Sequence, residues 1–175
     1  MFEKAAADLD RLAAEITRAT AARPVVLIDG RSGAGKSTLA AELAPALGAQ
    51  LVSLDDLYPG WGGLEAGSAA VHDTVLRERD AGWTRWDWAS ERAAEWHPLD
   101  AGSPIVVEGC GALSRANRAR ATFGIWVEMD AVERRRRALD REPDFAAHWD
   151  EWAAQEEAFA AREHPRDLAD LVLFG

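Results

Sequence analysis

Eight consecutive residues have the types and spacing that bind phosphate. They read Gly30-Arg31-Ser32-Gly33-Ala34-Gly35-Lys36-Ser37 and match the pattern G-x-x-x-x-G-K-[ST] at every fixed position. Glycines let the backbone adopt positive φ and approach an anion, while successive N–H groups point at phosphate oxygens. The alternative is a glycine turn with an incidental Lys-Ser pair. We expect a nucleotide to be bound by Gly30, Ser32, Gly33, Ala34, Gly35, Lys36, Ser37 and Thr38.

Acidic residues follow two apolar segments further along the chain. Asp55 closes the segment 50–54, and we expect it to be the catalytic base that accepts a proton from a substrate hydroxyl. Asp56 is the second choice, and a helix cap or turn aspartate is the alternative role. Glu108 ends a wholly apolar segment, where it would bind Mg²⁺ together with Ser37 or form a buried ion pair. Lys36 would reach the β- and γ-phosphates of ATP.

A run of arginines begins a later segment. Arg134, Arg137 and Arg141 are spaced i, i+3, i+7 and therefore share one helix face. On a lid over residues 131–163, Arg134 would contact ATP, while Arg137 and Arg141 would neutralise charge in the transition state. A solvated surface is the alternative reading of this run.

Tryptophan is unusually frequent, at 8 of 175 residues. One set fits a helical stripe that is typical of a core: Phe145, Trp149, Trp152 and Phe159. A second set lacks clear periodicity and offers walls for an organic acceptor: Trp61, Trp83, Trp86 and Trp88. The four histidines show no paired metal-ligand spacing.

The hydrophobic pattern predicts strands that alternate with helices. Strands are expected at 24–29, 50–54, 103–109, 123–128 and 171–174. Helices are expected at 2–20, 38–47, 69–81, 112–120, from 131 and at 144–161, with a loop at 59–66 and irregular or partly helical chain at 83–98. This order predicts an α/β fold, a three-layer α/β/α sandwich with a five-stranded parallel sheet. Ligands then bind at the carboxyl ends of the strands.

Composition narrows the class of protein. A length of 175 residues predicts a single domain, 1–175, and the net charge of −10 disfavours nucleic acid as a partner. The single cysteine leaves no disulfide framework. We see no secretory signal and no apolar run of 18 residues, so we expect a cytoplasmic protein without a membrane partner. The sequence is compatible with a homo-oligomer.

Taken together, these segments resemble the uridine kinase and phosphoribulokinase-like branch of the P-loop kinases. The resemblance covers roughly residues 24–174 and rests on Gly30–Thr38, Leu54-Asp55-Asp56-Leu57-Tyr58, Trp86-Asp87-Trp88, Val106-Val107-Glu108-Gly109, the lid arginines and Ala169-Asp170-Leu171-Val172. It implies a P-loop NTPase fold with a helical lid, Asp55 as the base, Tyr58 beside the acceptor, Glu108 near Mg²⁺ and lid arginines on phosphate. We therefore expect the acceptor to contact Tyr58, Trp61, Trp86 and Asp87.

The chain also departs from that family. It is shorter, and the family's Asn-Phe-Asp-His-Pro stretch, which helps to bind ribose, has no counterpart; Leu64-Glu65-Ala66-Gly67-Ser68 stands there instead. We expect an ATP- and Mg²⁺-dependent kinase that phosphorylates a hydroxyl of a small molecule, either a nucleoside such as uridine or another compact alcohol. The alternative is a regulatory P-loop module that hydrolyses ATP without a phosphoryl acceptor.

Overall fold

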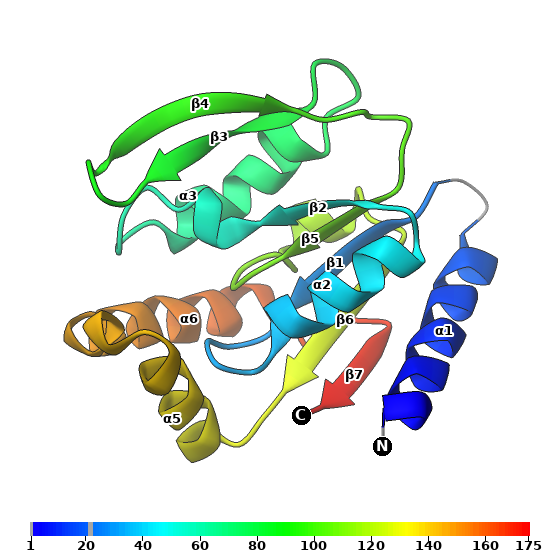
Figure 1. Cartoon of the computed structure of the whole chain (residues 1–175). Coiled ribbons are helices and arrows are strands. Elements are labelled where there is room, and N and C mark those ends of the chain that lie inside the picture. The colour runs from blue at the N-terminus through cyan, green and yellow to red at the C-terminus, as the bar shows by residue number, and fades with distance from the viewer. Residues whose placement is uncertain (1, 21–22) are drawn as a thin grey trace.

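Five parallel strands form the central sheet in the computed structural model, which describes residues 2–20 and 23–175 (Figure 1). The strands are β1 (Val25–Asp29), β2 (Gln50–Ser53), β5 (Ile105–Glu108), β6 (Phe123–Glu128) and β7 (Leu171–Phe174). They are ordered β2-β5-β1-β6-β7, and every neighbouring pair is parallel. The predicted five-stranded parallel sheet is confirmed. Because β1 and β5 are buried along their whole length, both faces of the sheet must be covered.

Helices cover the two faces. The helices are α1 (Phe2–Ala19), α2 (Lys36–Ala46), α3 (Leu64–Ala70), α4 (Arg115–Arg118), α5 (Ala131–Arg141) and α6 (Trp149–Glu163). Val26 and Ile28 of β1 pack with α1 and α2, whereas Val25 and Leu27 pack into the core under α3 and α6. Alternate side chains of one strand thus enter two cores, which makes the three-layer α/β/α sandwich. Among the described residues, none of these helices combines the length and apolarity that a membrane span needs.

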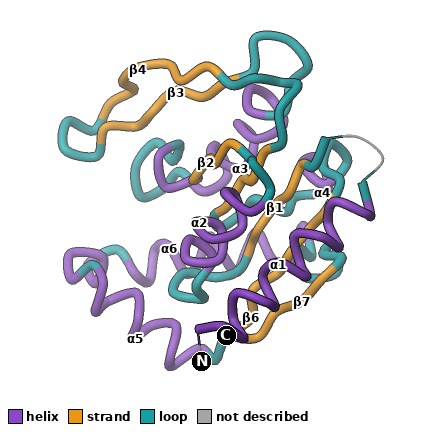
Figure 2. Tube along the Cα trace, turned by 45° about the vertical axis from the view of Figure 1, so that its right-hand side comes forward, coloured by secondary structure: helices purple, strands orange, loops and turns teal. Residues whose placement is uncertain are grey.

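An antiparallel hairpin lies outside the main sheet. It consists of β3 (Gly82–Asp87) and β4 (Arg92–Pro98), and Figure 2 shows it as a separate ribbon of two strands. The expectation of irregular or partly helical chain at 83–98 was wrong. The hairpin is held by cross-strand pairs: the rings of Trp83 and His97 stack 4.3 Å apart, and Arg85 pairs with Glu95 at 2.6 Å.

The helix after the second strand also begins earlier than expected. α3 starts at Leu64, inside the predicted loop 59–66, and a single π-helical segment, Val71–Val75, ends the helical stretch well before Ala81. Close packing explains the glycine at position 67 of this helix, because a Cβ there would lie 2.4 Å from the Tyr58 ring. The glycine therefore lets α3 pack directly against the turn that follows β2.

Candidate functional site

The phosphate-binding loop connects β1 to α2. Gly33 and Gly35 have φ of 81° and 102°, and a Cβ on Gly33 would lie 2.1 Å from the carbonyl oxygen of Arg134, so only glycine fits there. No side chain caps the start of α2. The N–H groups of the first helical turn have no partner within the helix, so they are available to an anion. A small cavity of about 50 Å³ lies against this loop; the loop residues that line it are Ser32, Gly33, Gly35, Lys36, Ser37 and Thr38.

Lys36 is buried beneath the loop. Its Nζ donates to the carbonyl oxygen of Arg31 at 3.2 Å and lies 3.4 Å from the Cys110 sulfur. Burial disfavours the charged ammonium, but the nearby carboxylates of Glu108 and Glu156 outweigh burial and raise the Lys36 pKa. Lys36 is therefore a protonated cation in the place where a nucleotide phosphate would lie.

Ser37 and Glu108 come together at the ends of α2 and β5. The Ser37 hydroxyl lies 3.2 Å from both carboxylate oxygens of Glu108, and Ser53 donates to Glu108 at 2.6 Å. Burial raises the Glu108 pKa, while Lys36 and the serine hydroxyls oppose the shift. These oxygen ligands suit Mg²⁺, which takes one or two protein groups besides phosphate and water. No group of three His, Cys, Asp or Glu side chains able to hold a metal occurs in the described residues.

Asp55 lies in a single 3-10 turn, Leu54–Asp56, directly after β2. The strand thus ends at Ser53, one residue before the predicted end. Asp55 lines the phosphate-loop cavity and also a second cavity of about 240 Å³. Asp56 lines only the second. Partial burial and the nearby Asp55 charge raise the pKa of Asp56, while Arg85 and His97 lower it.

The second cavity has aromatic walls. The aromatic residues that line it are Tyr58, Trp61, Trp88, Phe145 and Trp152, and its polar residues are Ser32, Asp55, Asp56, Arg141 and Glu142. The Tyr58 hydroxyl donates to the carbonyl oxygen of Cys110 at 2.8 Å, which fixes its ring. The Trp61 ring stacks on Phe145 with centroids 5.3 Å apart. We call this space the aromatic cavity.

Of the hairpin tryptophans expected to wall an acceptor pocket, Trp88 lines the cavity, whereas Trp86, which was expected to contact the acceptor, does not. Trp88 lines the aromatic cavity, and its indole N–H donates to the carbonyl oxygen of Asp55 at 2.9 Å. The structure does not bring Trp86 and Asp87 to this cavity. Asp87 accepts hydrogen bonds from Ala89 and Ser90 in the hairpin turn, and the Trp86 indole nitrogen is buried without a partner among the described residues.

The three arginines of α5 are placed differently from one another. Arg141 lines both cavities. Arg134 is buried, and its guanidinium donates to the carbonyl oxygen of Ser32 at 3.0 Å. Arg137 is half-exposed and donates to Glu133 at 2.8 Å. The common helix face predicted by their spacing does not place all three at the phosphate-loop cavity.

Glu156 of α6 was not singled out in the sequence. It is 5% exposed and accepts hydrogen bonds from the Ser32 amide at 2.8 Å, the Ser32 hydroxyl at 2.7 Å and the Cys110 thiol at 3.2 Å. A signal was available: position 156 falls on the apolar stripe of Trp152 and Phe159 at helical spacing. A carboxylate on a buried helix face requires a polar partner.

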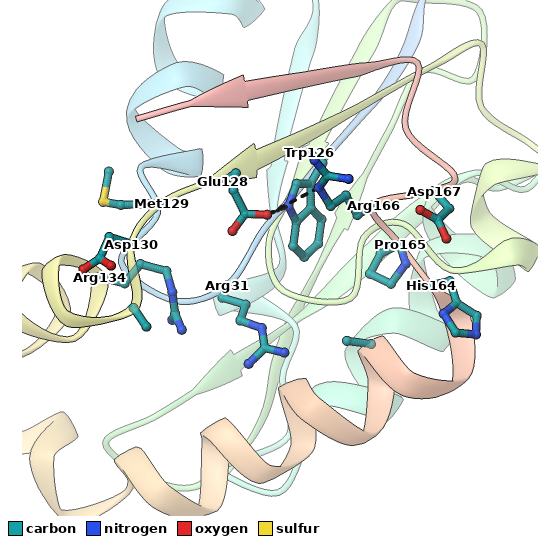
Figure 3. Close-up of a pocket in the computed structure, with 12 residues that line it drawn as sticks. Arg31, Trp126, Glu128, Met129, Asp130, Arg134, His164, Pro165, Arg166 and Asp167 are labelled. Carbon is teal, nitrogen blue, oxygen red and sulfur yellow. Dashed lines mark hydrogen bonds and ion pairs between the residues drawn. The ribbon is translucent and has the colours of Figure 1, made fainter.

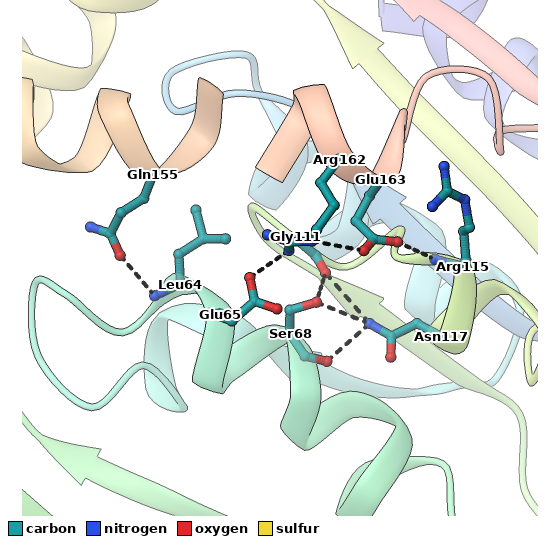
Figure 4. Close-up of polar contacts among 9 residues, drawn as sticks. All are labelled: Leu64, Glu65, Ser68, Gly111, Arg115, Asn117, Gln155, Arg162 and Glu163. Atoms are coloured by element: carbon teal, nitrogen blue, oxygen red, sulfur yellow. Dashed lines mark hydrogen bonds and ion pairs between the residues drawn. The ribbon is translucent and has the colours of Figure 1, made fainter. Parts of the chain in front are cut away.

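Polar contacts fasten α6 to the wall of the aromatic cavity (Figure 4). The Gln155 side-chain amide donates to the carbonyl oxygen of Trp61 at 2.7 Å. Its oxygen accepts from the Leu64 amide at 3.4 Å, as Figure 4 shows. Arg162 bridges Glu65 of α3 and Glu163 of its own helix. The loop that carries Trp61 is thus held from α6, the same helix that supplies Glu156.

A larger, open cavity of about 670 Å³ lies between β6, α5 and α6 (Figure 3). Trp126 donates to Glu128 at 2.9 Å along its wall, and Arg31 points into it. Of the residues predicted to function, only Arg134 lines it, and that arginine is hydrogen-bonded to the phosphate loop. Predicted site residues such as Lys36, Asp55 and Tyr58 line the two smaller cavities instead.

Solved structures with similar folds are kinase-like. A possible uridine kinase from Bacillus stearothermophilus superposes with a TM-score of 0.66 at 21% identity, covering 99% of this chain and 100% of that one. A putative fructose transport system kinase from Silicibacter sp. TM1040 gives 0.60 at 20% identity, covering 94% of this chain and 98% of that one. At these identities the likeness concerns the fold, and it confirms the predicted P-loop kinase-like fold.

Two curated relatives are tRNA dimethylallyltransferases. The protein from Rhodospirillum centenum is 35% identical over 166 residues, 87% of this chain and 52% of the relative. The protein from a Parafrankia species is 33% identical over 112 residues, 63% of this chain and 34% of the relative. The chain therefore spans about half of the first relative and a third of the second.

A family match covers the phosphate loop and most of the sheet. Residues 26–151 match the family described as AAA domain, from β1 to the first turn of α6. The chain belongs to this AAA domain family and has the nucleotide-binding P-loop fold.

Proposed function

We propose that the protein is an ATP- and Mg²⁺-dependent phosphotransferase that moves the γ-phosphoryl group of ATP to a hydroxyl of a small molecule. One observation carries the proposal: Ser32, Asp55 and Arg141 line both the phosphate-loop cavity and the aromatic cavity. A carboxylate and a guanidinium thus stand where a phosphate donor and an organic acceptor would meet.

Each group has a defined task in this reaction. The amides of the loop and Lys36 hold the β- and γ-phosphates, and Ser37 and Glu108 hold Mg²⁺, which neutralises phosphate charge when bound. Asp55 orients the acceptor hydroxyl and takes its proton. Arg141 stabilises the charge on the migrating group. Arg137, paired with Glu133, takes no part.

The aromatic walls suit an acceptor better than they suit water. Tyr58, Phe145 and Trp152 are buried and offer apolar surface beside Asp55. A bound acceptor displaces water from this space, which favours transfer over hydrolysis of ATP. A regulatory ATPase without an acceptor would have no use for such a cavity.

The test is ADP formation with and without a panel of hydroxyl compounds. We expect ADP formation to depend on an acceptor, and Asp55→Asn to lower transfer by about 10²- to 10⁴-fold while ATP affinity is kept. Asp140→Asn is the matched control, because Asp140 is exposed on α5 and lines neither cavity. Full activity of Asp55→Asn would remove Asp55 from the mechanism. ADP formation that ignores every acceptor would favour the regulatory ATPase.

A second candidate function follows from the curated relatives, whose name states transfer of a dimethylallyl group to tRNA. The net charge of −10 weighs against binding a polyanion of that size. The same experiment distinguishes the two functions when tRNA and dimethylallyl diphosphate are added to the panel. Prenylated tRNA would replace the kinase proposal.

A further inference from the structure

The aromatic cavity presents many hydrogen-bond acceptors and few free donors. Its neutral donors are largely in use: Ser32 donates to Glu156, Tyr58 to the Cys110 carbonyl and Trp88 to the Asp55 carbonyl. Besides two further indoles, Arg141 is the remaining donor, and it also lines the phosphate-loop cavity. Uracil, whose two carbonyl oxygens need donors, is poorly matched to this lining.

Charge in the cavity is predominantly negative. Three carboxylates line it, Asp55, Asp56 and Glu142, against the single guanidinium of Arg141. Arg85, which acts on Asp56 from the hairpin, is already paired with Glu95 at 2.6 Å, and His97 of β4 also contacts Glu95. With Arg141 assigned to the phosphate, the acceptor end of the cavity is left with uncompensated carboxylates.

Aromatic faces complete the lining. The rings of Trp61 and Trp88 lie 4.9 Å apart and are tilted by 54°, and Tyr58 meets Trp152 edge to face at 4.7 Å. Tilted rings form a corner whose π faces are negative, and such faces attract cations, Trp most strongly. Carboxylates and tryptophan faces in one small cavity are the combination that binds organic ammonium groups.

We propose that the phosphoryl acceptor is a cationic alcohol, a compact molecule that carries both a hydroxyl and an ammonium group. The ammonium lies in the corner of Trp61 and Trp88, near the carboxylates, and the hydroxyl reaches Asp55. The hydroxyl oxygen bonds to the γ-phosphorus, the bond from that phosphorus to the ADP oxygen breaks, and the hydroxyl proton passes to Asp55. The volume of about 240 Å³ limits the acceptor to a small molecule. This inference rests on the kinase function proposed above.

Matched acceptors that differ in charge test the inference. One pair is choline and 3,3-dimethylbutan-1-ol, which have the same shape; the other is glucosamine and glucose. We expect kcat/KM for ADP formation to favour the cation of at least one pair by about tenfold, as a desolvated cation–π contact allows. Equal use of both members in each pair, or preference for a neutral member or for uridine, would overturn it.

Binding separates this inference from the kinase function. Calorimetric titration of the ADP- and Mg²⁺-loaded protein with the same compounds needs no turnover. If no acceptor is phosphorylated but a cation binds about tenfold tighter than its neutral partner, the kinase function fails and the cation site stands. If neither cation binds more tightly than its neutral partner, the cation site fails whatever the turnover shows.

Charge removal in the cavity tests the residues. The double variant Asp56→Asn/Glu142→Gln is expected to abolish most of the preference for the cation. Its matched control is Glu133→Gln/Asp140→Asn, which removes two carboxylates that pair with arginines on the exposed surface of α5. Retained preference in the cavity variant, or equal loss in the control, would contradict charge recognition at this cavity.

Discussion

Asp29, at the end of β1, is a carboxylate buried beside the phosphate loop. It accepts hydrogen bonds from the amides of Gly30 at 2.7 Å, Leu113 at 2.8 Å and Gly111 at 3.2 Å. Burial raises the pKa of Asp29 from 3.8 to about 6, although the three amides and Lys36 oppose the shift. The side chain thus ties the loop to the segment after β5 and costs stability when ionised.

We predict a specific pH dependence for this residue. Because the folded pKa is the higher one, the folded state binds more protons between 3.8 and about 6, so the contribution of Asp29 to the free energy of unfolding falls as pH rises through that window. The loss amounts to about 3 kcal/mol. Urea unfolding from pH 4 to 7 should show this fall in the parent and in Asp140→Asn, an exposed control, but not in Asp29→Asn. If the free energy of unfolding changes with pH in the same way in the parent and in Asp29→Asn, the predicted pH dependence is refuted.

Glu156 gives a second prediction at this scale. Glu156→Ala removes the carboxylate oxygen Oε1, which accepts from both the Ser32 amide and the Ser32 hydroxyl, so both groups lose this partner. We expect a loss of about 1–3 kcal/mol in the free energy of unfolding and weaker ATP binding. The neighbouring Glu157→Gln breaks an exposed pair with Arg31 and should cost less than about 1 kcal/mol. If the substitutions at positions 156 and 157 change the free energy of unfolding and the ATP affinity equally, the role of Glu156 is contradicted.

At the scale of elements, the hairpin β3–β4 acts through one side chain. Trp88 follows β3 and reaches back to the turn after β2, where it donates to the Asp55 carbonyl. The hairpin therefore supplies a wall of the aromatic cavity and a constraint on the backbone of the proposed base.

Trp88→Phe tests this arrangement. The change keeps an aromatic ring but removes the hydrogen bond, so we expect KM for the acceptor to rise by about three- to tenfold while KM for ATP stays the same. Trp96→Phe is the control, because Trp96 is an exposed residue of β4 that does not line the cavity. A rise in KM for ATP alone would show that the hairpin acts on the phosphate loop instead.

The sequence predicted the sheet because its strand signals are local. In β1, for example, Val25 to Ile28 are all apolar, as is typical of a strand that is buried on both faces. The hairpin was not predicted because its strands pair residues that are far apart in the sequence. Trp83 pairs with His97, and a register shift between Thr84 and Trp86 interrupts the regular alternation. Trp88 lies just beyond the end of β3, in the hairpin turn, so strand spacing alone could not have chosen Trp88 over Trp86.

At the scale of the whole molecule, the two halves of the site differ in how they are encoded. The phosphate loop is contiguous, so its residues could be named from one motif. The aromatic cavity is assembled from the turn after β2, the hairpin and the junction of α5 with α6. Asp55 and Tyr58 were found by their strand-end position and by resemblance. Arg134, Arg137 and Arg141 make different contacts because of the way α5 packs on the phosphate loop. Sequence spacing does not specify that packing.

The crowding of indoles around one small cavity also makes the protein its own optical probe. Three of the eight tryptophans line that cavity, and the chain's lone tyrosine lies 4.7 Å from one of them, Trp152. Light absorbed by Tyr58 is therefore passed to an indole instead of being emitted by the phenol. A molecule that enters the cavity displaces water from these rings and changes the colour of their emission, so occupancy can be followed in the unlabelled protein.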